Sequence, residues 1–178
     1  MKINWSKIKV VIFDVDGTLY NQRKLRMYIL MKLLKYYIMR PQRLQELKIL
    51  RDFRREREKR AFDALDDIES DQYNWGAQAS GVSPEKVRNV VEKWIFSIPL
   101  KYIPYCRYSG VLEFFNNLHK RGITSAIFSD YPAKEKVDAL GLSPNCIVCS
   151  TDRNVDRLKP DPKGLFVIVE TLGVSVEE

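Results

Sequence analysis

The sequence predicts an α/β protein with a Rossmann-like parallel sheet as its core and an inserted, all-helical subdomain. Apolar runs rich in β-branched residues indicate three buried strands, at residues 8–14, Ile123–Phe128 and Cys146–Cys149. Helical patterns follow the second and third runs, as in parallel sheets with right-handed crossovers. Between the first two runs the spacing is helical throughout. We therefore expect two parts: a core of residues 1–19 and 104–178, and a helical subdomain of residues 20–103.

The first strand runs into an acidic turn, Asp14-Val15-Asp16-Gly17-Thr18. Because side chains alternate along an extended chain, Asp14 and Asp16 should point the same way while Val15 turns into the protein. Ligands of open α/β sheets bind beyond the carboxyl ends of strands, so both carboxylates are expected at a site. Such a pair suits a nucleophile or metal ligand beside a general acid/base. Taken alone, an acidic turn without chemistry is the simpler interpretation.

Two basic helices open the predicted subdomain. The first spans Gln22–Met39, and the second follows Pro41 with an apolar stripe of Leu44, Leu47, Leu50 and Phe53. Arginine and lysine residues cover the rest of the second helix. The net charge of the chain is +7. A basic face is typical of a solvated helix, but it also attracts phosphorylated substrates, nucleic acid or an anionic membrane surface.

Further helices are expected where capping and stop signals frame an apolar stripe. Ser83 and Pro84 form a good helix start, with serine as cap and proline at the first helical position. Glycines end the helices of the core. The predicted core helices span Ser109–Lys120, Pro132–Leu140 and Pro162–Leu172.

The cysteines indicate a reducing compartment. Their odd number, Cys106, Cys146 and Cys149, and the lack of a signal-peptide pattern predict free thiols and a cytoplasmic protein. Cys146 and Cys149 have C-x-x-C spacing, but residues three apart in a strand point to opposite faces, so no metal or redox role is expected. The apolar stretch Met27–Met39 is too short to span a bilayer, and no membrane partner is predicted.

Polar residues also follow the second and third strands: Ser129-Asp130, and Lys159 within Leu158-Lys159-Pro160-Asp161. With the Asp-x-Asp-Gly-Thr turn, their order resembles the haloacid dehalogenase-like (HAD) superfamily in its phosphatase branch. That family combines a D-x-D-G-T motif, a serine or threonine ending a hydrophobic strand, and a lysine often followed by proline. In isolation, Ser129 as a loop cap and Lys159 as a solvated side chain would be the simpler interpretations.

The resemblance implies hydrolysis of phosphate monoesters. Asp14 would attack phosphorus and form an aspartyl-phosphate, while Asp16 would act as general acid and then base. Asp14 and the main-chain carbonyl of Asp16 would hold Mg²⁺, the implied cofactor. Ser129 would bind a phosphoryl oxygen, and Lys159 would offset the negative charge. The dehalogenase branch lacks an acid at the position of Asp16, which favours phosphate transfer over carbon–halogen cleavage.

The helical subdomain resembles the family's cap, which closes over the site and selects the substrate. On this basis we expect Thr18, Ser129, Asp130 and Arg23 to bind a small phosphorylated metabolite, with Tyr20 and Asn21 as further candidates for contacts from the cap side. The sequence does not specify which metabolite is used, and a homo-oligomer is compatible with it.

The family's fourth motif is one or two acids at the end of a further strand, and the chain ends before it. Asp152, Asp156 and Asp161 do not match this motif by position. The resemblance therefore predicts a core that is incomplete at the C-terminus and two alternatives for function. One is a Mg²⁺-dependent phosphatase; the other is a truncated or inactive homologue that serves as a binding or regulatory module. Nucleic-acid binding is not expected, since aromatic or groove-reading motifs are lacking.

Overall fold

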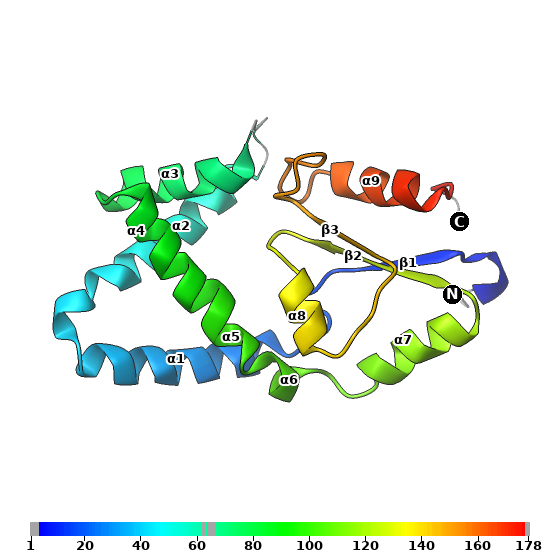
Figure 1. The fold of residues 1–178 in the computed structure, drawn as a ribbon, viewed down its shortest axis with the longest axis horizontal. Helices are drawn as coiled ribbons and strands as arrows, with labels where there is room; N and C mark the ends of the chain where they lie inside the picture. Colours follow the sequence, from blue (N-terminus) through cyan, green and yellow to red (C-terminus); the bar gives the residue numbers. More distant parts are fainter. Residues whose placement is uncertain (1–3, 62, 64–66, 177–178) are drawn as a thin grey trace.

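The computed structural model describes residues 4–61, 63 and 67–176. Within these residues the fold class predicted from the sequence is confirmed: a parallel sheet with strand order β1-β2-β3 and a helical insert between its first two strands (Figure 1). The strands are β1 (Val10–Phe13), β2 (Thr124–Ser129) and β3 (Cys146–Cys149). Strand β3 has its predicted bounds, β2 is shifted by one residue, and β1 begins two residues later and ends one residue earlier than its predicted run.

Helices cover both faces of the sheet (Figure 1). Helices α7 (Val111–Lys120) and α8 (Lys134–Ala139) lie on one face, and α9 (Lys163–Leu172) lies on the other. Phe115 of α7 and Val137 of α8 belong to one cluster of buried apolar residues with Ile127 of β2. Ile168 of α9 belongs to a second cluster with Phe128 of β2. Ile12 pairs with Ala126, and Ala126 with Cys146, so the three strands end at one rim.

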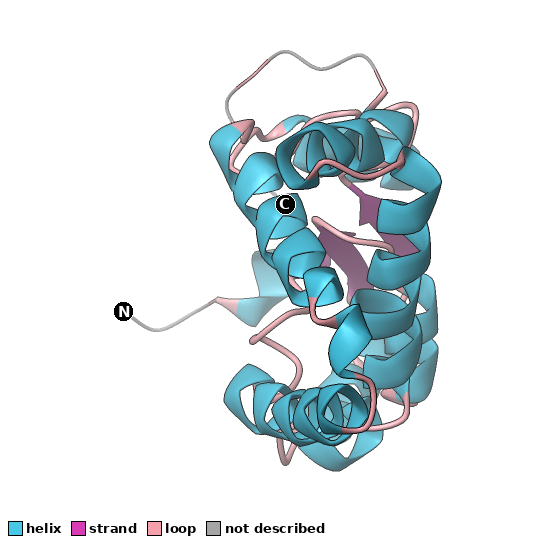
Figure 2. Ribbon diagram, turned by 90° about the vertical axis from the view of Figure 1, so that its left-hand side faces the viewer, coloured by secondary structure: helices cyan, strands magenta, loops and turns pink. Residues whose placement is uncertain are grey.

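The helical insert extends from α1 to α6 and forms the left half of Figure 1. Figure 2 views the molecule from this side, with the strands behind the helices. Its elements are α1 (Gln22–Ile38), the 3₁₀ turn Pro41–Arg43, α2 (Gln45–Lys59), α3 (Ile68–Ser80), α4 (Pro84–Val91), the π-helical segment Glu92–Ser97, α5 (Ile98–Leu100) and α6 (Ile103–Cys106). Ser83 caps α4 as predicted, its side chain accepting a hydrogen bond from the backbone of Lys86.

The buried face of α2 differs from the predicted leucine stripe. Leu44 and Leu47 are exposed, and the most buried apolar residues are Ile49 and Phe53. Beside them α2 buries charged residues: Glu46, Asp52, Glu56 and Arg57. Lysine and arginine residues one to four positions away pair with these acids, which compensates for the removal of the carboxylates from water. The spacing of apolar residues along the sequence could not predict these ion pairs.

One contact set joins the insert to the strand ends. The guanidinium of Arg57 donates a hydrogen bond of 2.7 Å to the backbone carbonyl of Asp130 and lies 4.4 Å from the ring centroid of Tyr131. It also donates to the side chain of Gln72 on α3. Helix α2 is therefore fastened to the loop that follows β2. Among the helices of the described residues, none is long and apolar enough to cross a membrane.

Candidate active site

Asp14 and Lys159 meet at the rim of the sheet. The Nζ of Lys159 lies 2.7 Å from Oδ1 of Asp14 and also donates to the backbone carbonyl of Phe128 at 2.8 Å. The other carboxylate oxygen of Asp14 accepts a 3.1 Å hydrogen bond from the hydroxyl of Thr18. The side chain of Asp14 remains 41% exposed. A partly exposed carboxylate held from two sides can attack a substrate that approaches from solvent.

Asp16 is held by two donors that come from different parts of the chain. Lys136, on α8, places its ammonium 2.8 and 2.7 Å from the two carboxylate oxygens of Asp16. The phenol of Tyr20 donates to Oδ1 of the same carboxylate. Burial and the charge of Asp16 raise the pKa of Tyr20, so this phenol stays protonated and remains a donor.

Ser129 and Asp130 organise the loops beyond the strands. Ser129 is only 1% exposed, and its Oγ accepts a hydrogen bond from the backbone of Tyr131. Oδ1 of Asp130 accepts hydrogen bonds of 2.9 Å from the backbone N–H of Lys159 and from the hydroxyl of Ser150. The carboxylate of Asp130 thus positions the backbone that carries Lys159.

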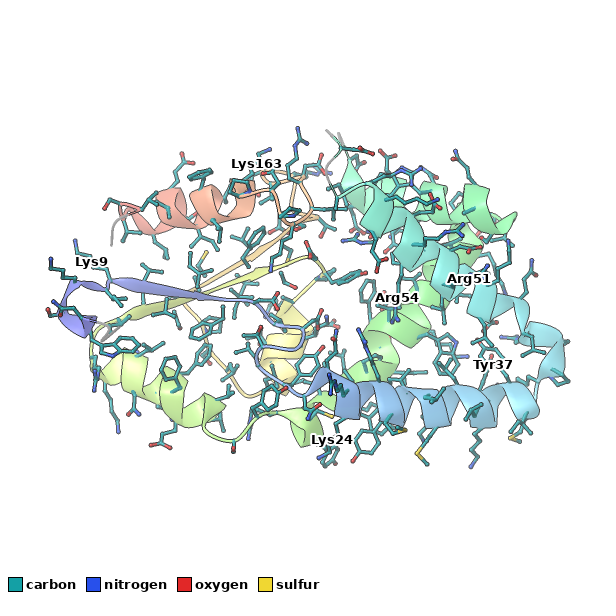
Figure 3. All side chains as sticks on the ribbon, turned by 180° about the vertical axis from the view of Figure 1, so that it is seen from behind. Lys9, Lys24, Tyr37, Arg51, Arg54 and Lys163 are labelled. Carbon is teal, nitrogen blue, oxygen red and sulfur yellow. The ribbon has the colours of Figure 1, made fainter. Side chains whose placement is uncertain are left out.

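A cavity of about 920 Å³ lies between the insert and the core. Asp16, Tyr131 and Lys136 line it from the core side. Figure 3 shows Arg51 and Arg54 on α2, which line it from the insert. The other lining residues are Tyr20, Gln22, Leu25, Arg26, Ile29, Leu30, Leu33, Leu47, Leu50, Arg55, Glu58, Trp94, Ile95 and Pro99. The walls are therefore mainly apolar, with a cluster of arginines and two acids, Asp16 and Glu58.

Not every residue predicted for the site reaches this cavity. Arg23 lies on the exposed first turn of α1 and is not among the lining residues, whereas Arg26, one turn further on, is. Leu47 and Leu50, expected in a helix core, line the cavity instead. Tyr20 also lines it, while the side chain of Asn21 caps α1 by accepting a hydrogen bond from the backbone of Lys24.

The residues that could hold a metal are few. Within the described part of the chain, no group of three or more histidine, cysteine, aspartate or glutamate side chains could hold an ion. Asp14 and the backbone carbonyl of Asp16 are the oxygen donors that the family resemblance implies for Mg²⁺. Magnesium often uses one or two carboxylates together with waters and phosphate oxygens, so these donors fit a site that substrate helps to complete.

Two contributors to the site, Lys136 and Arg57, escaped the sequence analysis, and a third, Tyr20, has a contact that it did not predict. Lys136 lies in a short helix and has no motif around it; only its position soon after Ser129 could have drawn attention to it. Arg57 belongs to a run of basic residues that is typical of a solvated face, yet it is only 4% exposed. Tyr20 was expected to make contacts from the cap side, but its bond to Asp16 had no sequence signal.

Together, an α/β core, a helical insert over the strand ends and an aspartate–lysine pair at the rim define an α/β protein with a covered site at the ends of its strands. The family model of the haloacid dehalogenase-like hydrolases matches residues 8–178. The chain belongs to this family. Among the curated proteins, none matches the sequence significantly.

Solved structures of this family share the fold. A 2-haloacid dehalogenase from Pseudomonas syringae pv. Tomato is 17% identical, with a TM-score of 0.58 over 94% of this chain and 74% of its own. A candidate HAD hydrolase from Bacillus subtilis, bound to magnesium, is 15% identical, with a TM-score of 0.52 over 93% and 72%. A candidate phosphoglycolate phosphatase from Lactobacillus delbrueckii is 20% identical, with a TM-score of 0.50 over 95% and 75%. At these identities the likeness concerns the fold alone.

Proposed function

We propose that the protein hydrolyses phosphate monoesters through an aspartyl-phosphate on Asp14. The observation that carries this proposal is the 2.7 Å contact between Lys159 and Asp14, which fixes a partly exposed carboxylate beside the amino group of a lysine. A carboxylate can act as a nucleophile towards phosphorus and split one difficult step into two easier ones. Lys159 offsets the negative charge that nucleophile and phosphoryl group bring together.

Asp16 supplies the proton transfers of both steps. When Asp14 attacks, the bond between phosphorus and the leaving oxygen breaks, and Asp16 gives a proton to that oxygen. A water molecule then attacks the aspartyl-phosphate and passes a proton back to Asp16, which restores Asp14 and releases inorganic phosphate. The substrate phosphate offers Lys136 a second anionic partner, so that Asp16 can take up the proton that it donates.

The anchored acid favours hydrolysis of a phosphate ester over cleavage of a carbon–halogen bond. An alkoxide is a strong base and needs a proton when it leaves, whereas a halide ion is a weak base and needs none. Lys136 and Tyr20 hold Asp16 in place at the cavity. An acid fixed in this way serves a reaction with an oxygen leaving group.

Magnesium is the cofactor that we propose for this site. Asp14 and the backbone carbonyl of Asp16 would hold it, and the ion would neutralise phosphoryl charge when bound. The arginines and apolar walls of the cavity suit a small phosphorylated metabolite with a second acidic or an apolar group.

The test is release of phosphate from p-nitrophenyl phosphate, with magnesium or with a chelator. We expect metal-dependent turnover that Asp14→Asn removes, falling by roughly four orders of magnitude or to background. Asp138→Asn, which changes an exposed acid on α8, is the matched control and should retain activity. Chloroacetate, assayed in parallel, reports halide release.

Three results would contradict the proposal. Halide release without phosphate release would assign the site to carbon–halogen cleavage. Turnover that persists in Asp14→Asn would place the nucleophile elsewhere. Folded protein without either activity would favour a binding or regulatory module.

A further inference from the structure

The outer face of α1 is a continuous apolar surface. Met27, Met31 and Ile38 are 59%, 63% and 78% exposed, and Leu30, Leu34 and Met39 are exposed as well. Residues 27, 31, 34 and 38 follow one another at helical spacing and therefore share one face of α1. Figure 3 shows sulfur-bearing side chains that project from α1 away from the other helices. A stripe of large exposed apolar residues marks an interaction surface.

Basic residues flank this stripe, and its own stretch of the sequence carries no acid. Residues 21–45 contain no aspartate or glutamate. At 100° per residue, Lys24 and Lys35 border the stripe on one side and Arg26 borders it on the other. The exposed basic residues of α1 and the turn after it are Arg23, Lys24, Arg26, Lys32, Lys35, Arg40 and Arg43.

A basic hollow adjoins one flank of the stripe. It has a volume of about 290 Å³ and is lined by Lys32, Lys35, Arg40 and Lys93, together with Tyr36, Met39, Trp94 and Ile98. The ammonium of Lys93 lies 3.6 Å from the ring centroid of Tyr36. Four cations around a concave apolar floor suit an anionic headgroup whose hydrocarbon part lies along the neighbouring methionine and isoleucine.

We propose that the outer face of α1 docks on the surface of a membrane that contains anionic phospholipids. A protein surface binds at the membrane interface through exposed apolar side chains with lysine and arginine beside them, and the outer face of α1 has this pattern. The expectation of no membrane partner rested on the lack of a helix long enough to span the bilayer, for which α1 is too short. In-plane docking needs no such length.

A second copy of the chain is a poorer occupant of this surface. A two-fold pair formed through the stripe would bring the basic residues of both copies to one interface. No acid between residues 21 and 45 could balance them. An anionic lipid surface instead attracts each basic residue, while the acyl region receives the apolar stripe.

The test is co-sedimentation of the full chain with vesicles of phosphatidylcholine alone or mixed with phosphatidylserine. We expect binding to the mixed vesicles that weakens as salt is raised. Met31→Gln/Leu34→Gln/Ile38→Gln and Lys24→Glu/Lys35→Glu should each weaken it, on the order of tenfold or more. Circular dichroism and thermal unfolding establish that each variant is folded.

Two matched controls lie elsewhere on the molecule. Lys120→Glu/Arg121→Glu makes the same charge change at the end of α7, and Phe166→Gln removes an exposed apolar residue from α9. Both should bind vesicles like the unchanged protein.

The proposal is overturned if folded protein stays in the supernatant with mixed vesicles, or if binding is insensitive to the α1 variants. It is also overturned if light scattering shows a dimer that the α1 variants dissociate, since the stripe would then be a contact between copies. Full inhibition of vesicle binding by soluble glycerophosphoserine would show that the surface binds a free phosphate compound and not a membrane. This result would also overturn the proposal.

Discussion

The ammonium of Lys136 reaches both carboxylate oxygens of Asp16, at 2.8 and 2.7 Å, although the residues are 120 positions apart. The side chain of Lys136 is 8% exposed and that of Asp16 is 22% exposed. A shielded pair of this kind is costly to break from one side, because the remaining charge is left without a partner. The pair therefore connects α8 to the acidic turn after β1.

Replacement of Lys136 by methionine should lower both stability and activity. It leaves Asp16 with Tyr20 as its donor, and we expect a loss of about 1–3 kcal/mol in the free energy of unfolding. The kcat for p-nitrophenyl phosphate should fall by about tenfold to a hundredfold, because Asp16 is no longer held to take the proton of the attacking water. Urea unfolding and steady-state kinetics measure the two effects. Lys134→Met, in the same helix but 79% exposed, should change neither appreciably.

A double-mutant cycle isolates the pair itself. Asp16→Asn and Lys136→Met, measured singly and together by urea unfolding, should show a coupling of about 1 kcal/mol or more. Additive losses would mean that the two side chains do not stabilise each other.

Lys159→Met should abolish most catalysis with little effect on substrate binding. Its ammonium neutralises charge on Asp14 and the phosphoryl group, so kcat should fall by about 10²–10³-fold. Lys163→Met, four residues further on at the start of α9 (Figure 3), is the matched control. An equal fall in kcat in both variants would show that the effect comes from the loss of one positive charge anywhere in this region and not from the contact with Asp14.

Asp130 offers a pair of substitutions that separate positioning from binding. Asp130→Asn keeps the oxygen that accepts hydrogen bonds from Lys159 and Ser150, whereas Asp130→Ala removes it. We expect the asparagine variant to retain most of its activity and the alanine variant to lose about tenfold or more in kcat. If Asp130 contacts substrate through its charge, Asp130→Asn will instead raise KM strongly.

The stability of the insert should depend on pH through Glu56. Hydrogen bonds from Lys59 and Arg60 lower the pKa of Glu56 from 4.5 to about 2. A lowered pKa in the folded state contributes stability above pH 4.5 that is lost as the pH falls towards 2. The urea midpoint of Glu56→Gln should therefore be lower at neutral pH and should change less between pH 4.5 and 2. Glu113→Gln, on the exposed side of α7, should keep the acid dependence of the unchanged protein.

The sheet and its polar rim were within reach of sequence reasoning because they depend on local patterns. The runs that became β2 and β3 have the composition of buried strands, and parallel strands place their ends at one rim. Asp14 and Lys159 could therefore be expected together before any distance was known. The helical insert followed in the same way from apolar spacing.

Contacts across the fold were beyond such patterns. Lys136 meets Asp16 only because α8 packs beneath the acidic turn, and nothing in its neighbours marks it. The acids buried along α2 depend on cations in adjacent turns. The pattern of apolar residues alone therefore predicted the wrong buried face for this helix. Arg23 and Arg26 are one turn apart in sequence, and the way α1 packs on the fold brings only Arg26 to the cavity.

Arg57 links the helical insert to the end of the sheet that carries Lys159. Its guanidinium holds the carbonyl of Asp130, whose side chain in turn holds the backbone of Lys159. The position of α2 and the position of Lys159 are thus connected by consecutive hydrogen bonds through Asp130. Under the proposed function, a substrate that moved α2 would also move the backbone of Lys159 without touching that residue.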